Sequence, residues 1–192
     1  MMEDLSLHIL DLAENALNAG ATRIGIAITE NIPGDRLTIR VSDNGRGMSA
    51  PDRRRALDPF FTTQKKRTGL GLSLLTQAAR QCGGDVALVT TPGRGTRVTA
   101  RFLHAHIDRQ PLTKMAETIM ILVLGNPEVV FRYRHRRNDR VFTLTSDRFT
   151  GGRGLGIPDH PRVIGALQQT LRAGLARIGV QPNPKKKVAG RR

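Results

Sequence analysis

The sequence has no tryptophan, a single tyrosine and a single cysteine, and aromatic residues make up 4% of it. A surface that stacks on unpaired nucleic-acid bases therefore has few side chains available. The lone cysteine, Cys82, excludes a disulfide within the chain and fits a reducing compartment. No apolar run approaches the roughly 18 residues that a membrane-spanning helix needs. These absences, with an acidic start unlike a signal peptide, lead us to expect a cytoplasmic protein without a membrane partner.

Positive charge is the largest imbalance in the composition, with a formal net charge of +15 at pH 7. More than half of it belongs to residues 151–192, which hold nine Lys and Arg residues and one acid, Asp159. Glycine and proline in the same region are typical of linkers and tails. A basic tail binds nucleic acid or acidic surfaces without sequence preference, but a solvated terminus explains the same composition. Nucleic acid is therefore a partner that the sequence leaves open and does not favour.

Hydrophobic periodicity divides the chain into helices and paired strands. A broad apolar face predicts a helix over residues 5–19, and strict alternation predicts strands over 22–29 and 37–41. The later patterns predict a short helix at 51–57, a helix ending near Gln81, a hairpin of 86–90 and 96–103, a helix at 111–124, a hairpin of 129–133 and 141–145, and an isolated amphipathic helix at 161–178. Hairpins separated by helices favour a mixed sheet over a doubly wound parallel one. The predicted fold class is α+β, a two-layer sandwich of a mixed, mostly antiparallel sheet with helices on one face.

A first glycine motif follows the second predicted strand. Asp43 stands at the end of that strand, and Gly45 and Gly47 come directly after it. Without a Cβ, these glycines let the backbone turn tightly and approach a flat ligand. The Asp43 carboxylate can accept a hydrogen bond from an exocyclic amine such as that of adenine, and it rejects guanine, whose edge carries a carbonyl there. The motif therefore predicts an adenine-recognising loop.

A second glycine motif opens a predicted helix about twenty residues later. Gly69 and Gly71 lead into its N-terminus, where free N–H groups and the helix dipole favour phosphate. Lys65, Lys66 and Arg67 stand just before it, within reach of a terminal phosphate. The spacing matches neither the Walker loop nor the Rossmann fingerprint. It predicts a phosphate site of a different kind.

The first predicted helix adds a carboxylate and an amide to this site. Asp11 and Asn15 are four residues apart and so lie on one helix face. An asparagine is a weak Mg²⁺ ligand by itself, but it suffices where phosphates supply most of the coordination. Asp11, one turn earlier, would stand near a nucleophile that attacks the γ-phosphate, where a general base or water-orienting group belongs. Together the three segments predict a site for ATP and Mg²⁺.

In their order along the chain, these segments resemble the Bergerat-fold ATP-binding domain shared by DNA gyrase, the heat-shock chaperone of that class, sensor histidine kinases and MutL. Residues 12–22 are similar to the asparagine box of MutL, whereas residues 60–63, 69–73 and 93–96 are closer to histidine kinases. The resemblance covers about residues 5–104. Four boxes in order make it far more specific than a lone Gly-x-Gly.

The resemblance implies a role for each matching residue. Asn15 would hold Mg²⁺, and Asp43 would recognise adenine with Thr96 assisting beside it. Asp11 occupies the place where hydrolysing and serine-kinase members have a glutamate, so it would act as a base or only position water. The residues that would line the base, form the lid and contact the phosphates are Gly45, Gly47, Lys65, Lys66, Thr68, Gly69, Leu70, Gly71 and Leu72.

Two departures separate the chain from particular relatives. The lid between the glycine motifs is short, which suits histidine kinases and anti-sigma kinases better than MutL, gyrase or the chaperone. The domain begins near residue 5, and we expect no dimerisation helix with a phosphoacceptor histidine before it. His8 lies within the asparagine-box helix and is expected to be structural. The sequence is thus interpreted as a stand-alone, histidine-kinase-like ATPase domain.

Three hypotheses for function follow from the sequence. The first is an ATP- and Mg²⁺-dependent regulatory protein kinase or ATPase of the histidine-kinase or anti-sigma type, acting on a protein partner or a phosphoacceptor in trans. The second is a non-catalytic ATP sensor whose lid orders on nucleotide binding and exposes a docking face. The third is a DNA-linked ATPase of the MutL type, which the basic tail favours and the short lid disfavours.

The predicted organisation has three parts. Residues 1–106 would form the Bergerat-type ATP-binding domain, and residues 107–148 a small helix–hairpin extension that docks on it because it is too small for its own core. Residues 149–192 would form a basic, Gly- and Pro-rich tail that contains one helix.

Overall fold

The computed structural model describes residues 4–56, 71–150 and 161–180. Its strands form one sheet in the order β3-β4-β2-β1-β5-β6. Their bounds are β1 (Arg23–Asn31), β2 (Arg36–Asp43), β3 (Asp85–Thr91), β4 (Gly95–Leu103), β5 (Val130–Arg137) and β6 (Arg140–Thr145). Every neighbouring pair is antiparallel except β1 and β5, which are parallel. The sheet is therefore mixed and mostly antiparallel, as the sequence predicts.

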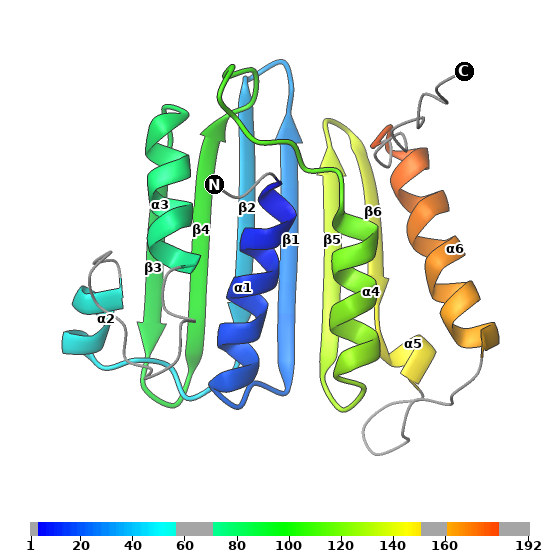
Figure 1. The fold of residues 1–192 in the computed structure, drawn as a ribbon, viewed down its shortest axis with the longest axis horizontal. Coiled ribbons are helices and arrows are strands. Elements are labelled where there is room, and N and C mark those ends of the chain that lie inside the picture. The colour runs from blue at the N-terminus through cyan, green and yellow to red at the C-terminus, as the bar shows by residue number, and fades with distance from the viewer. Residues whose placement is uncertain (1–3, 57–70, 151–160, 181–192) are drawn as a thin grey trace, which may run out of the picture.

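Four longer helices lie on one face of this sheet (Figure 1). They are α1 (Leu5–Asn18), α3 (Gly71–Gln81), α4 (Met115–Gly125) and α6 (Pro161–Arg177), and two short helices, α2 (Ala50–Ala56) and α5 (Asp147–Thr150), lie in connections. The predicted α+β class with helices on one face is confirmed. None of the helices in the described ranges is long and apolar enough to cross a membrane.

Alternation along the central strand explains why the helices cover one face. Ile24, Ile26 and Ile28 of β1 are at most 1% exposed, and the residues between them point to the opposite face. On α1, the apolar residues that pack against the sheet recur at helical spacing and form one buried face. They are Leu5, Ile9, Leu12, Ala13 and Ala16. The sandwich core therefore follows from the two periodicities of the sequence.

Asp4 joins the start of α1 to the segment that precedes α4. One of its carboxylate oxygens accepts the Ser6 backbone N–H at 2.9 Å and caps α1. The other accepts the backbone N–H of Thr113 at 3.0 Å and the Thr113 hydroxyl at 2.7 Å, while the Pro111 carbonyl accepts from Leu5 N–H. Because Pro111 and Thr113 are held in these contacts, α4 begins at Met115, four residues later than predicted.

The last described helix corrects one prediction. The sequence predicts an isolated helix at 161–178, but α6 packs against α4 and β6. Leu167, Leu171 and Leu175 are at most 3% exposed and belong to the same core as α1 and the sheet. The amphipathic pattern predicts the helix itself, and α6 confirms it. The surface on which the helix packs is built by α4 and β6, and no local pattern around residues 161–178 indicates it.

A buried polar cluster joins β1 to β5. The Glu30 carboxylate bonds to the Nε2 atoms of His135 at 2.7 Å and of His104 at 3.0 Å. The Nδ1 atom of His135 lies 2.8 Å from the Tyr133 hydroxyl, and both rings are at most 1% exposed. Burial by itself would raise the pKa of Glu30, but the hydrogen bonds from the two histidines lower it to about 2. The cluster therefore ties the two parts of the sheet through a charged carboxylate.

The packing of α6 on β6 gives a testable prediction about a glycine. A Cβ added to Gly174 would overlap the Phe142 ring, whereas one added to Gly165 on the same helix meets nothing within 4 Å. Overpacking costs about 1–3 kcal/mol, and alanine regains about 1 kcal/mol of helix propensity. We expect Gly174→Ala to lower the free energy of unfolding in urea and Gly165→Ala to raise it. Equal effects of the two substitutions would contradict the packing of α6.

Candidate functional site

Asp43, at the end of β2, is held by two backbone donors. One carboxylate oxygen, Oδ1, accepts the N–H of Gly45 at 2.8 Å and that of Thr96 at 3.2 Å. Burial raises the pKa of Asp43, and these two hydrogen bonds oppose the rise. The second oxygen makes no hydrogen bond to any residue in the described ranges. The carboxylate is thus oriented by the backbone, with one oxygen left to accept from a ligand.

The two glycines after Asp43 allow a close backbone approach. A Cβ on Gly45 would lie 2.9 Å from the Ala19 carbonyl oxygen, which already accepts the Arg46 N–H at 2.9 Å. Gly47 has a φ of 66°, and a Cβ there would overlap the Thr91 carbonyl. Side chains at these positions would therefore push the loop away from α1 and from the β3–β4 hairpin.

Two residues that the sequence analysis did not single out also hold this loop. The Asn44 side-chain oxygen accepts the backbone N–H groups of Thr22 and Arg23, which fixes the loop to the start of β1. The Thr90 hydroxyl accepts the Met48 N–H at 2.9 Å and lies 3.0 Å from the Thr96 hydroxyl. The sequence offers one signal for Thr90, because Thr90 and Thr96 face each other across the β3–β4 hairpin. Using that signal requires the exact pairing register of the two strands, which the sequence alone does not give.

Asp11 faces the start of α3. A Cβ on Gly71 would lie 2.9 Å from a carboxylate oxygen of Asp11, so no larger residue fits there without moving that side chain. Burial raises the pKa of Asp11, and the negative charge of Glu14 raises it further. The first turn of α3 contains no acidic residue to offset its dipole. A proton acceptor therefore stands beside a helix N-terminus that favours anions.

Asn15 lies one turn after Asp11 and is half-buried. Its side-chain amide makes no hydrogen bond to a residue in the described part of the chain, so its oxygen is available to a cation. No group of three or more acidic, histidine or cysteine side chains within the described ranges forms a metal cluster. These residues fit a Mg²⁺ ion that takes most of its ligands from phosphates and water.

His8 belongs to the core beneath this site. It is 2% exposed, and burial lowers its pKa, while the Gln110 side chain and the Gly71 backbone offset part of the shift. Neither ring nitrogen makes a well-formed hydrogen bond within the described residues. The ring is thus enclosed near Gln110 and Gly71, away from solvent.

The structure thus brings together some of the predicted residues. One cluster consists of Asp43, Gly45, Gly47 and Thr96. A second contact joins Asp11 on α1 to Gly71 at the start of α3. Leu72 is 8% exposed and packs in the core. The remaining lid and phosphate residues, Lys65, Lys66, Thr68, Gly69 and Leu70, lie outside the described residues.

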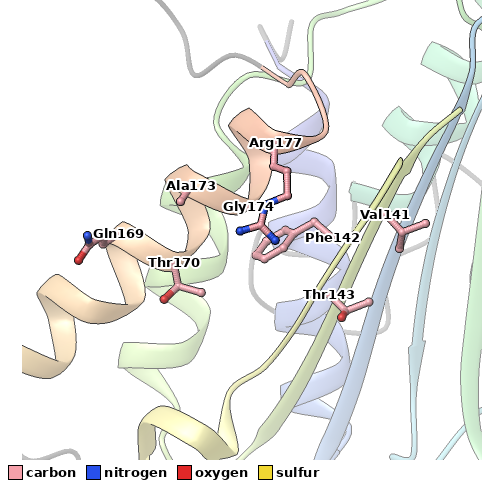
Figure 2. A pocket seen from close by; sticks show the side chains of 8 residues that line it. All are labelled: Val141, Phe142, Thr143, Gln169, Thr170, Ala173, Gly174 and Arg177. Atoms are coloured by element: carbon pink, nitrogen blue, oxygen red, sulfur yellow. The ribbon is translucent and has the colours of Figure 1, made fainter. Parts of the chain in front are cut away.

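A different hollow lies between β6 and α6 (Figure 2). It has a volume of about 430 Å³ and is lined by residues 141–143 together with α6 side chains that include Gln169 and Arg177. None of the predicted nucleotide residues contributes to it. A ligand that binds in this hollow would contact different residues from a nucleotide at the predicted site, so the two binding locations can be told apart by experiment.

Comparison with known proteins places the chain in a family. The model of the family described as histidine kinase-, DNA gyrase B-, and HSP90-like ATPase matches residues 3–106. This match covers more than half of the 192 residues. The chain belongs to this family, and the resemblance stated from its motifs is confirmed.

Curated relatives include sensor kinases. Sensor histidine kinase ZraS of Escherichia coli O157:H7 is 33% identical over 95 residues, which cover 50% of this chain and 21% of ZraS. Alginate biosynthesis sensor protein KinB of Pseudomonas aeruginosa is 35% identical over 89 residues, covering 45% of this chain and 15% of KinB. The chain therefore corresponds to a small part of each relative.

A solved structure shares the fold over a longer stretch. The Aquifex aeolicus MutL ATPase domain, complexed with ADP, superposes with a TM-score of 0.55 and 22% identity. The likeness covers 88% of this chain and 70% of that chain, so it extends beyond the family match into the α4–β6 region.

Proposed function

We propose that this chain binds ATP with Mg²⁺ at the site formed by α1, the loop after β2 and the start of α3. The orientation of Asp43 carries the proposal, since Oδ1 accepts two backbone N–H groups and Oδ2 is left for the adenine amine. The ADP-bound state of the MutL domain with the same fold supports a nucleotide as the ligand. Asn15 would hold the cation, which would neutralise and orient the phosphates.

We further propose that the bound ATP is hydrolysed or transferred, as in a regulatory protein kinase or ATPase of the histidine-kinase or anti-sigma type. Asp11 supports this role because its raised pKa and its place beside Gly71 suit a group that accepts a proton or orients the attacking nucleophile. The phosphoacceptor would be a protein in trans. ZraS and KinB, as sensor proteins, support signalling as the setting.

Two alternatives make different predictions. A non-catalytic ATP sensor would bind ATP with the same residues but show no turnover that depends on Asp11. A MutL-like, DNA-linked ATPase would show turnover that duplex DNA stimulates. The shared fold with MutL supports this alternative, and the short lid expected from the sequence argues against it.

Substitution of Asp43 tests the nucleotide site. Asn preserves the acceptor for Gly45 and Thr96 but presents an amide donor to the adenine amine, so a hydrogen bond to a charged group is lost. Such bonds contribute about 1.5–3 kcal/mol, so Asp43→Asn should weaken ATP binding about 10- to 150-fold in an equilibrium titration and narrow the preference for ATP over GTP. Asp85→Asn, at an exposed carboxylate on β3, is the matched control. Equal ATP affinity in Asp43→Asn and the wild type would overturn the assignment.

A further inference from the structure

The face of the sheet that the long helices leave uncovered is rich in arginine. Because the β1 isoleucines point toward the helices, Gly25, Ala27 and Thr29 point to the opposite face, and the strand register extends that face across the neighbouring strands. In Figure 1 all four long helices lie on the near side of the strands. The far face carries eight exposed arginines: Arg23 on β1, Arg36 and Arg40 on β2, Arg97 and Arg101 on β4, and Arg132, Arg134 and Arg136 on β5.

We call this surface of eight arginines the arginine face. Acidic side chains compensate almost none of its positive charge. Among the strand residues of this face the one acid is Asp85, which pairs with Arg101 at 2.7 Å. The other seven arginines make no ion pair with any residue in the described ranges. Eight positive charges against one negative on a single sheet face form a surface that attracts a polyanion.

The arginines form two walls around a floor of small residues. In the register, Ala27 lies between Arg40 on β2 and Arg134 on β5, and Gly25 lies beside Arg132. Two strand spacings separate the walls by roughly 10 Å, and the successive arginines 132, 134 and 136 of β5 are roughly 6.6 Å apart. Exposed guanidinium groups therefore follow both sides of β1, where they can contact successive anionic groups of one extended polyanion.

We propose that the arginine face binds the phosphate backbone of double-stranded nucleic acid. Arginine presents a planar fork of donors that binds phosphate in a bidentate manner, and the face uses no lysine. The aromatic strand residues, including Phe131 and Tyr133, point toward the helices, so unpaired bases find no stacking partner here. Contacts to the backbone alone bind duplexes without regard to sequence.

An anionic membrane is the competing occupant, and the face fits it less well. Interfacial binding needs apolar anchors among the charges. The large exposed aliphatic residues of this face, Val89, Leu103 and Val141, lie at the outer strands or at a strand end, away from the two walls. The proposal does not rest on the ATP site, which lies on the helix side of the sheet.

The test measures binding of the full chain to a fluorescent duplex DNA of random sequence by anisotropy, over a series of salt concentrations. We expect Arg132→Gln/Arg134→Gln/Arg136→Gln to weaken binding at least tenfold and to reduce the salt slope by about 3, since each phosphate contact contributes about 0.9. Arg36→Gln/Arg40→Gln, on the opposite wall, should reduce the slope by about 2. An unchanged thermal melt establishes that each variant is folded.

Two matched variants separate this face from total charge and from the basic tail. Exposed arginines of the helix layer are replaced in Arg80→Gln/Arg162→Gln/Arg172→Gln, and tail lysines in Lys185→Gln/Lys186→Gln/Lys187→Gln. Near-wild-type binding by both would support the arginine face. Absence of DNA binding by the wild type, an equal loss in all the triple variants, or binding only to anionic lipid vesicles would overturn it.

Discussion

Asp11→Asn is expected to reduce ATP turnover by about 10²- to 10⁴-fold, the range that a positioned general base contributes, while ATP still binds. Asparagine preserves the size of the side chain next to Gly71 but cannot take a proton. Burial and the charge of Glu14 raise the pKa of Asp11, which makes its carboxylate a better proton acceptor than an exposed aspartate. Phosphate release or phosphoryl transfer measures turnover, and a parallel equilibrium titration measures ATP binding. Together they separate a loss of turnover from a loss of ATP affinity.

Glu14→Gln supplies the control for this prediction. Turnover needs ionised Asp11, so it falls as the pH drops through the pKa of that group. Removing the neighbouring negative charge lowers this pKa, so the acid limb of the pH–rate profile should move to lower pH. A profile that stays in place, with turnover intact in Asp11→Asn, would refute the base role and favour the ATP-sensor alternative.

Glu30→Ala is expected to destabilise the fold by about 3–5 kcal/mol, because it removes two hydrogen bonds to a charged carboxylate, and such bonds contribute about 1.5–3 kcal/mol each. The substitution leaves His135, which is fully buried, without the carboxylate that its Nε2 atom contacts. It also removes the hydrogen bond to His104, which directly follows β4, and the 3.8 Å ion pair with Arg137 on β5. Denaturant unfolding at pH 7 measures the loss. Glu128→Ala, at an exposed carboxylate just before β5, should change the stability by less than about 0.5 kcal/mol.

The same carboxylate gives the fold an acid dependence. The pKa of Glu30 falls from an ordinary value of 4.5 to about 2 on folding, so its contribution is complete above pH 4.5 and is lost as the pH falls toward 2. Wild-type stability should therefore decline over that interval, and the Glu30→Ala curve should be flatter there. Parallel curves for the two proteins would contradict a charged Glu30 in the cluster.

Local patterns were sufficient to predict most of the first 104 residues. The apolar face of α1, the alternation in β1 and β2, and the glycine punctuation of the β3–β4 hairpin all arise between residues close in sequence. The family resemblance implied Thr96 as a neighbour of Asp43, and the Thr96 N–H does donate to the Asp43 carboxylate.

Contacts between distant segments could not be predicted in this way. The parallel pairing of β1 with β5 joins residues more than 100 positions apart, and Glu30 showed no pattern that marks it as the partner of His135. The docking of α6 depended on a surface formed by α4 and β6 together. The arginine face emerged only from the register, since its residues come from four strands and look like ordinary polar alternation in each.

The most direct test of the proposed ATP site is to locate the bound nucleotide. Amide NMR spectra of the ¹⁵N-labelled chain, recorded during a titration with ATP and Mg²⁺, give this location. We predict that the largest shifts occur at Asn15, at Gly45 and Gly47, at Gly71 and at Thr96, whose N–H groups or neighbours define the site. ATP should produce them at lower concentration than GTP. Shifts confined to the hollow between β6 and α6, or none at millimolar ATP, would contradict the nucleotide site described here.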